Sequence, residues 1–314
     1  VKVARLVEDY IAYKNTLGYQ IRIEAYTLRR FAKYLQGINY RGSLTTKIAL
    51  SWIDGFGDIG SWYKARLYET IRTFSRYACV VDPESFMLPK GICGCHGRTN
   101  PYIYTDEEAA SMMDELAAVH SPDGLRAKSL SCMFGLMYSC GLRPSECIRL
   151  TIQDYDSGSG SITILNSKFN RSRIVPLSDS AAAAIELQIA AMAARHGKRN
   201  ALFQRTGGVP FDIRAVEYGW KITRDALLPP GSASWDRRPP RPYDCRHSFC
   251  THTIERWLGE RSDINALMPL LSIYVGHRKV ADTYWYLAAT DLLLDSAADA
   301  FWTWVEDESY EKRC

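Results

Sequence analysis

The sequence predicts a mainly α-helical protein of two domains, with one small β-hairpin in the second domain. Three observations support this fold class. Apolar residues recur at helical spacing over the first 80 residues, a stretch without periodicity follows, and a short strand–turn–strand pattern lies among helical segments near residues 161–176. A length of 314 residues suits two domains, and 46% hydrophobic with 24% charged residues is a globular composition.

The first domain, residues 1–82, is predicted to contain four helices that each bury one face. The first helix is indicated by an i, i+3, i+4, i+7, i+8 stripe that begins at Val3, and the third covers about Thr46 to Ile53. The apolar positions expected in the core from the first, second and fourth helices are Val3, Leu6, Val7, Tyr10, Ile11, Leu28, Phe31, Leu35, Leu67, Ile71, Phe74 and Ala78.

Basic residues are concentrated in the first third of the chain. Residues 1–100 hold 15 Lys and Arg against 8 Asp and Glu, and the rest holds 24 against 27, within a net charge of +4. This asymmetry indicates a surface that binds a polyanion, although such rows of charge are also typical of an ordinary solvated face. The candidate DNA contacts on the second and fourth helices are Arg29, Arg30, Lys33, Lys64, Arg72 and Arg76.

Residues 83–104 contain three prolines and several glycines without periodicity, which predicts a linker. Cys93, Cys95 and His96 lie in this stretch and invite a metal interpretation. We expect a loop and no metal, because a second ligand pair at zinc spacing is absent from the sequence.

The second domain, residues 105–314, is predicted to open with a capping box at Thr105 and Glu108. Helices are expected at about 106–119, 122–140 and 178–195, with the hairpin strands at 161–165 and 173–176. A Pro- and Arg-rich loop over 228–242 precedes a last run of helices. The apolar stripe of a final helix consists of Leu294, Ala297, Ala298, Phe301 and Val305.

The chain is expected to act in the cytoplasm, in association with the nucleoid. Its longest apolar stretch, 129–142, is too short to cross a bilayer, and the amino end carries no secretory signal pattern. Nine cysteines without the spacing of a disulfide framework suit reduced thiols.

Four segments of the second domain carry residues suited to phosphoryl chemistry. They are Gly141-Leu142-Arg143-Pro144-Ser145-Glu146, Ser167-Lys168-Phe169-Asn170-Arg171-Ser172-Arg173-Ile174-Val175-Pro176-Leu177, Tyr243-Asp244-Cys245-Arg246-His247-Ser248-Phe249, and Gly276-His277 with Tyr286 nine residues later. Fixed arginines hold phosphate oxygens and stabilise the charge of a pentacovalent transition state. A tyrosine is able to attack phosphorus once its proton is lost.

These segments, in this order and spacing, resemble the tyrosine recombinase (phage integrase) family. The resemblance covers the whole second domain and identifies the first as a helical core-binding domain by helix number and charge. It implies an α+β catalytic domain in which Arg143 and Arg246 hold the phosphate, Lys168 is the general acid and His277 donates to the phosphate, with Tyr286 as the nucleophile. Tyr284 is the rival nucleophile, but it lies about 200° from Tyr286 around a helix.

One position departs from the family pattern. Tyr243 stands where the family usually has histidine at a catalytic position that handles phosphate and protons. A phenol still donates a hydrogen bond, but its ordinary pKa near ~10 puts an acid/base role for Tyr243 in doubt. Further phosphate contacts are expected from the hairpin and the Arg-rich loop, at Arg171, Arg173, Arg237, Arg238 and Arg241.

The resemblance implies a site-specific recombinase that joins DNA through a 3′-phosphotyrosine, with double-stranded DNA as partner and without metal, ATP or another cofactor. It also implies a homotetramer on paired sites, with the final helix docking on a neighbouring subunit. Two alternatives stay open: a type IB topoisomerase-like enzyme that relaxes DNA, and a DNA-binding regulator that has lost cutting. The run Tyr284-Trp285-Tyr286-Leu287 slightly favours a recombinase of a mobile element.

Overall fold

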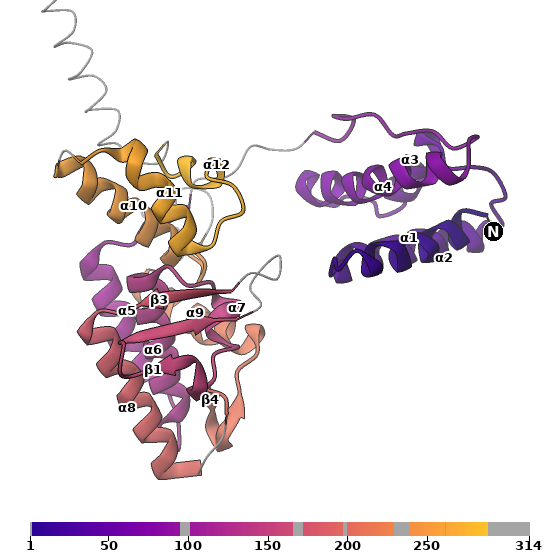
Figure 1. The fold of residues 1–314 in the computed structure, drawn as a ribbon. Coiled ribbons are helices and arrows are strands. Elements are labelled where there is room, and N and C mark those ends of the chain that lie inside the picture. Colours follow the sequence, from indigo (N-terminus) through magenta and orange to yellow (C-terminus); the bar gives the residue numbers. More distant parts are fainter. Residues whose placement is uncertain are drawn as a thin grey trace, which may run out of the picture. The chain divides into compact units, whose positions relative to one another are not determined.

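A computed structural model describes residues 2–94, 101–165, 172–196, 200–228, 239–260 and 262–287 of the chain. The chain divides into two compact units, Val1–Arg98 and Thr99–Cys314, and each is described by itself (Figure 1). No helix in the described parts of either unit has the length and apolar character needed to cross a membrane.

Unit 1 contains four helices in its described residues, as the periodicity predicts. They are α1 (Lys2–Thr16), α2 (Arg22–Gly37), α3 (Thr46–Asp54) and α4 (Ser61–Val81). Every apolar residue predicted on an inner face of α1, α2 or α4 is buried. The side chain of Thr45 accepts a hydrogen bond from the main-chain N–H of Ile48 (3.3 Å), which fixes the start of α3.

Both ends of the predicted linker belong to the units on either side. Leu88 is buried in the core of unit 1, and the Tyr68 hydroxyl donates to the carbonyl oxygen of Pro89 (2.9 Å). Tyr104 is fully buried in unit 2. The predicted range 83–104 is therefore too long, because a short segment without periodicity gives no sign of which side chains it will bury.

Unit 2 begins with α5 (Asp106–Ala118), and the predicted capping box is confirmed. The Thr105 side chain accepts from the Glu108 N–H (3.1 Å), and the Glu108 carboxylate accepts from the Thr105 N–H (3.1 Å). The remaining helices are α6 (Leu125–Cys140), α7 (Pro144–Cys147), α8 (Asp179–His196), α9 (Ile213–Leu227), α10 (Asp244–Gly259), α11 (Ile264–Val275) and α12 (Ala281–Tyr284).

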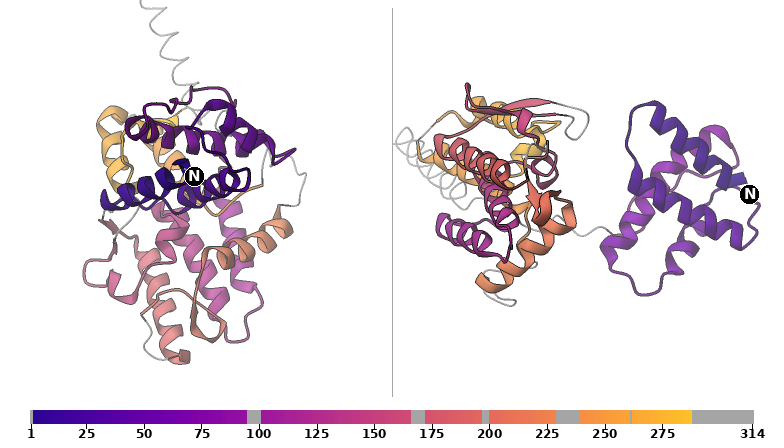
Figure 2. Two further views of the ribbon diagram at one scale, coloured as in Figure 1. Left: turned by 90° about the vertical axis from the view of Figure 1, so that its right-hand side faces the viewer. Right: turned by 90° about the horizontal axis from the view of Figure 1, so that it is seen from below.

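The predicted hairpin is present as part of a small antiparallel sheet in the order β1-β2-β3. β2 (Ser161–Ile164) pairs with β3 (Arg173–Pro176), and β1 (Tyr155–Asp156) adds a two-residue edge that the sequence did not indicate. Helix α8 lies beside this sheet (Figure 2). The Tyr155 hydroxyl donates to Glu186 on this helix (2.9 Å). A second sheet joins β4 (Gln204–Arg205) to β5 (Val209–Pro210) across the 3-10 turn η2 (Thr206–Gly208), and another 3-10 turn, η1 (Ile152–Asp154), precedes β1.

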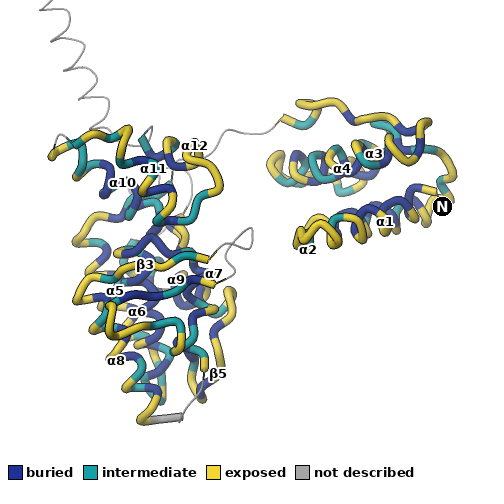
Figure 3. Tube along the Cα trace, in the orientation of Figure 1, coloured by how far each residue is buried: buried dark blue, intermediate teal, exposed yellow. Residues whose placement is uncertain are grey.

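Helix α6 forms the centre of unit 2 and is buried over most of its length (Figure 3). It lies against α5, α8 and α10, so its carboxyl end is held from several sides. A smaller apolar cluster joins α10, α11 and Tyr286. The segment that leaves α6 at Gly141 therefore starts from a fixed point next to α10 and α11.

Several predicted features lie outside the described residues. They are Cys95, His96, Lys168, Arg171, Arg237, Arg238 and the final helix with its apolar stripe. The predictions for these residues stay predictions.

Candidate active site

The turn after α6 positions the first arginine of the site. Gly141 ends α6 in the left-handed region (φ 62°), and an added Cβ there would lie 2.5 Å from Cδ1 of Phe249. Only glycine therefore suits this position. Arg143 then caps α7, with Pro144 at the first helical position, so the chain leaves the buried helix and immediately begins a new one.

Arg143 is held by Glu146 and by the main chain of the segment after α11. Its Nη1 donates to Glu146 (2.6 Å) and its Nη2 donates to the carbonyl oxygen of Gly276 (3.0 Å). Burial acts to lower the pKa of Arg143, but the charge and hydrogen bond of Glu146 outweigh burial and raise the pKa above its ordinary value. Arg143 therefore stays positively charged, and its guanidinium joins Glu146 on α7 to the main chain at Gly276.

Arg246, in the first turns of α10, is completely buried. Its Nη1 donates to the carbonyl oxygen of Gly141 (2.7 Å) and its Nη2 to that of Val275 (2.5 Å). Its Nε has no hydrogen-bond partner, and no carboxylate among the described residues pairs with the guanidinium. Burial, followed by the charge of Arg143, lowers the pKa of Arg246. A buried cation without a counter-ion is costly, which indicates that an anion completes this site.

His277 follows the left-handed Gly276 that ends α11 (φ 68°). Its Nδ1 lies 2.7 Å from the Oγ1 of Thr283, which fixes the plane of the ring. Burial, and then the charges of Arg246 and Arg143, lower the pKa of His277 to about 3. The imidazole is therefore neutral at physiological pH and acts as a hydrogen-bonding group.

Tyr286 completes the cluster from the segment just after α12. Its side chain is buried, and its ring stacks on that of His277 with centroids 6.0 Å apart and an 8° angle between planes. The ring of His247 lies 5.4 Å away at a tilt of 52°. The rival residue, Tyr284, is 40% exposed and has no part in this stack.

The hydroxyl of Tyr286 lies next to the thiol of Cys250 on α10. Burial raises the pKa of Tyr286, the neighbouring Cys250 raises this pKa further, and Arg246 lowers it in part. Burial also raises the pKa of Cys250 to about 11, so both groups are protonated near neutral pH. The sequence did not single out Cys250, because its contact with Tyr286 joins residues 36 positions apart.

Tyr243 lies at the N-cap of α10, on the open side of the cluster, and is 36% exposed. It lies next to Arg143, and its ring and the ring of His247 form a T-shaped pair with centroids 5.2 Å apart. Arg143, Tyr243, Arg246, His277 and Tyr286 are thus brought together from three segments far apart in the sequence. The spatial convergence on which the sequence interpretation depended is present.

Arg173 lies inside the protein and not on the hairpin surface. Its Nη1 and Nη2 donate to the two carboxylate oxygens of Glu146 (3.0 and 2.9 Å), and its Nε donates to the carbonyl oxygen of Tyr274 (2.8 Å). Its side chain is only 10% exposed. This corrects the prediction that Arg173 contacts DNA, because all three nitrogens donate to acceptors within the protein.

Some of the other described cations that were predicted to contact DNA have partners within the protein, and the rest are exposed or partly buried. Arg29 pairs with Glu8 (2.9 Å), Arg72 pairs with Glu69 (2.7 Å), and the Arg30 guanidinium lies over the ring of Phe56 (4.7 Å). Lys33 and Arg76 are exposed and Lys64 is partly buried, whereas the exposed Arg241 pairs with the buried Asp244 (3.8 Å).

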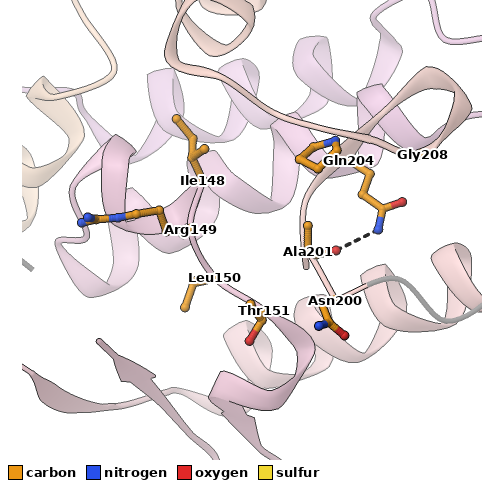
Figure 4. A pocket seen from close by; sticks show the side chains of 9 residues that line it. Ile148, Arg149, Leu150, Thr151, Asn200, Ala201, Gln204 and Gly208 are labelled. Carbon is orange, nitrogen blue, oxygen red and sulfur yellow. Dashed lines mark hydrogen bonds between the residues drawn. The ribbon is translucent and has the colours of Figure 1, made fainter. Parts of the chain in front are cut away.

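One cavity of unit 2 is separate from this cluster. It has a volume of about 430 Å³ and lies between the segment after α7 and the segment before β4 (Figure 4). The side chain of Gln204 at its edge donates to the carbonyl oxygen of Ala201 (2.8 Å). None of the five residues of the cluster lines this cavity.

Comparisons with known proteins show that the chain is similar to integrases and recombinases. The model of the phage integrase family matches residues 103–292. The integrase/recombinase y4rB of Sinorhizobium fredii is 30% identical, covering 93% of this chain and 94% of that protein. The tyrosine recombinase XerD of Staphylococcus saprophyticus is 24% identical, covering 90% of this chain and 92% of that protein.

Two solved structures share the fold at low sequence identity. The Tn1549 transposon integrase in complex with circular intermediate DNA matches with a TM-score of 0.66 at 16% identity, covering 95% of this chain and 99% of that one. The recombinase XerH bound to a palindromic difH substrate matches with a TM-score of 0.62 at 16% identity, covering 88% and 78%.

Proposed function

The chain belongs to the phage integrase family and is a tyrosine recombinase, and from this premise we propose that it cuts and rejoins DNA at specific sites through a covalent bond to Tyr286. The observation that carries the proposal is the buried guanidinium of Arg246, which has an unpartnered Nε and no paired carboxylate in the described residues. A DNA phosphate is the anion that this arrangement fits.

The neighbours of Arg246 support a phosphate in particular. The charge of Arg143 lowers the pKa of Arg246, which means that two cations lie close together. Two adjacent guanidinium groups suit the non-bridging oxygens of one phosphate and stabilise the charge that develops during displacement. Neutral His277 adds a hydrogen-bonding group with no further positive charge to desolvate.

The reaction forms a bond between the Tyr286 oxygen and phosphorus and breaks the bond from phosphorus to the 5′ oxygen of the next nucleotide. Tyr286 releases its phenolic proton to water, and the departing 5′ oxygen gains a proton in the same step. Lys168, carried by the hairpin, is the proposed donor of that proton. The product is a 3′-phosphotyrosine with a free 5′-hydroxyl. Reversal rejoins DNA without ATP or a metal, because the phosphodiester energy is kept in the protein–DNA bond.

Tyr243 serves as a hydrogen-bond donor to the phosphate in this proposal. Its position beside Arg143 and its partial exposure support this role, with the substrate entering from the side of the cluster where Tyr243 lies. A phenol does not exchange a proton readily at neutral pH, so Tyr243 orients the phosphate and leaves proton transfer to other groups.

Double-stranded DNA is the proposed partner, and the basic helices of unit 1 contribute to its binding through Lys33, Lys64 and Arg76. Binding through phosphates releases counter-ions, so affinity should fall steeply as salt rises. Exchange of strands between two sites needs a homotetramer, which the final helix is proposed to assemble.

The proposal is tested with a suicide substrate that carries a nick next to the cleavage site, so that the covalent product accumulates. Wild-type protein should form an adduct that survives denaturing electrophoresis, and Tyr286→Phe should form none. Tyr284→Phe is the matched control and should retain the adduct. Loss of the adduct in Tyr284→Phe with retention in Tyr286→Phe would contradict the assignment. Relaxation of supercoiled DNA without recombinant product would favour a topoisomerase-like enzyme instead.

A further inference from the structure

One buried carboxylate serves two arginines behind the candidate active site. The Glu146 side chain has no exposed surface. It accepts from the Nη1 and the main-chain N–H of Arg143 (2.6 and 2.9 Å) and from both terminal nitrogens of Arg173 (3.0 and 2.9 Å). Arg143 and Arg173 therefore compete for, and share, a single negative charge.

Arg173 also contacts the segment that carries His277. Its Nε donates to the carbonyl oxygen of Tyr274 (2.8 Å), and its guanidinium lies so close to Gly276 that a Cβ there would be 3.1 Å from Nη1. The carbonyl oxygen of Gly276 in turn accepts from Arg143 (3.0 Å). Arg173 thus lies behind both Arg143 and His277 without belonging to the proposed phosphate site.

The charges of Arg143, Glu146 and Arg173 together determine the electrostatic potential that Arg143 presents. A buried Arg143–Glu146 pair alone would be neutral overall, and the carboxylate would hold the guanidinium away from any other anion. With Arg173 present, the three side chains carry one net positive charge. The second arginine offsets the charge of Glu146, so Arg143 remains oriented by the carboxylate and still presents positive potential to a phosphate.

We propose that Arg173 is a positioning residue that offsets the charge of Glu146, so that Arg143 stays available to the scissile phosphate. This inference rests on the proposed function of the site. It also explains why a cation of the hairpin turns inward, because strand β3 is the element that brings the second positive charge to Glu146.

The first test replaces the charge but retains the bulk, with Arg173→Met. Arg224→Met is the matched control, because Arg224 is also largely buried, pairs with a carboxylate and donates to the carbonyl oxygen of Pro240 (3.2 Å). In single-turnover cleavage of the nicked substrate, Arg173→Met should slow adduct formation roughly tenfold to a hundredfold, whereas Arg224→Met should change it less than about threefold.

A substrate of altered charge separates an electrostatic role from a purely structural one. A methylphosphonate at the cleavage position removes one negative charge from the phosphate. If Arg173 acts through the potential at Arg143, the loss caused by Arg173→Met should be several-fold smaller on this substrate than on the phosphodiester. An equal loss on both substrates would overturn the inference.

A second variant makes the inference falsifiable at Glu146 itself. In Arg173→Met, the carboxylate is left to neutralise Arg143, so adding Glu146→Gln should restore positive potential and make the double variant faster than Arg173→Met alone. A double variant that is no faster, while thermal unfolding shows both proteins to be folded, would reject the proposed role. Absence of any Tyr286-dependent adduct in wild type would instead reject the proposed function.

Discussion

Arg246 donates a hydrogen bond from Nη1 to the main-chain oxygen of Gly141, 105 residues earlier in the chain (2.7 Å). Its Nη2 donates to Val275 in the same way, so one guanidinium joins the end of α6 to the end of α11. These two bonds set the direction of the remaining Nε, which has no hydrogen-bond partner among the residues that the structure describes. The hydrogen bonds to Gly141 and Val275 therefore fix the orientation in which the Arg246 guanidinium would meet a ligand.

Replacing Arg246 with lysine should abolish most cleavage without unfolding the protein. A single ammonium group is unable to reproduce the forked bonds to Gly141 and Val275 and also face a phosphate. Arg246→Lys should reduce single-turnover adduct formation by about 100-fold or more, which is typical for loss of one donor to a transition-state charge. The rate is measured on the nicked substrate at saturating protein.

The matched comparison is DNA affinity, measured by fluorescence anisotropy at fixed salt. Many phosphate contacts share the binding energy, so affinity for duplex DNA should change far less than the cleavage rate. Normal cleavage by a folded Arg246→Lys would argue against the assignment of Arg246 to the scissile phosphate.

Tyr243→His should retain cleavage and acquire a new dependence on pH. Histidine is the residue that the family usually carries at this position, and its ordinary pKa lies near ~6.5. Because Arg143 lies beside it, the charged imidazole is disfavoured, so the new titration should fall at or below that value. Cleavage rates from pH 5 to 8 test this, with wild type flat over the range in which the variant changes. Complete inactivity of Tyr243→His would contradict a role limited to hydrogen bonding.

The resemblance of the sequence motifs predicted which residues lie together in the cluster, but not the ways in which they are held. Arg143, Arg246, His277 and Tyr286 follow from motifs of fixed spacing, and each lies in the cluster. The burial of Arg173 was not predicted. A cation in a hairpin has the same sequence pattern whether it faces solvent or a buried carboxylate from another segment. The Tyr286–Cys250 contact was missed for a similar reason, since a lone apolar-context cysteine carries no signal of its partner.

Secondary structure and burial were likewise predictable where a sequence pattern repeats, and not where it is absent. The stripes of α1, α2 and α4 predicted burial because a helical face repeats over many residues. The two-residue strand β1 has no such repeat, and it pairs only because β2 offers an open edge. The ends of the linker were assigned wrongly since Leu88 and Tyr104 are single residues without a pattern.

The low pKa of His277 predicts that the free protein becomes less stable in acid. In the unfolded chain the histidine binds a proton near its ordinary pKa of 6.5, whereas in the folded state burial and the two arginines lower that pKa to about 3. Between these values the unfolded state holds more protons, so the free energy of unfolding falls as pH decreases from about 6.5. Urea unfolding at pH 7 and at pH 5 measures this decrease in the free energy of unfolding.

His277→Gln removes this titration and retains a group able to form a hydrogen bond to Thr283. Its free energy of unfolding should therefore decline less between pH 7 and pH 5 than that of wild type. An identical decline in both proteins would show that His277 takes up its proton in the folded state.

Gly141→Ala should destabilise the protein more than Gly160→Ala, although both glycines have positive φ (62° and 57°). The backbone cost of placing an L-residue in this region is about 1–2 kcal/mol at either position. At Gly160 a Cβ meets open space, whereas at Gly141 it would lie 2.5 Å from the ring of Phe249, which stacks on Tyr274. Displacing that ring adds about 1–3 kcal/mol, as is usual when a well-packed core is overfilled.

The same pair of variants should separate stability from catalysis. Gly141→Ala moves the carbonyl oxygen that orients Arg246, so its cleavage rate should fall even in conditions where urea unfolding shows the protein to be folded. Gly160→Ala lies in the turn before β2 and should cleave at the wild-type rate once folded. Equal destabilisation of the two variants, or normal cleavage by folded Gly141→Ala, would mean that Phe249 moves aside without disturbing the turn, and that the orientation of Arg246 does not depend on it.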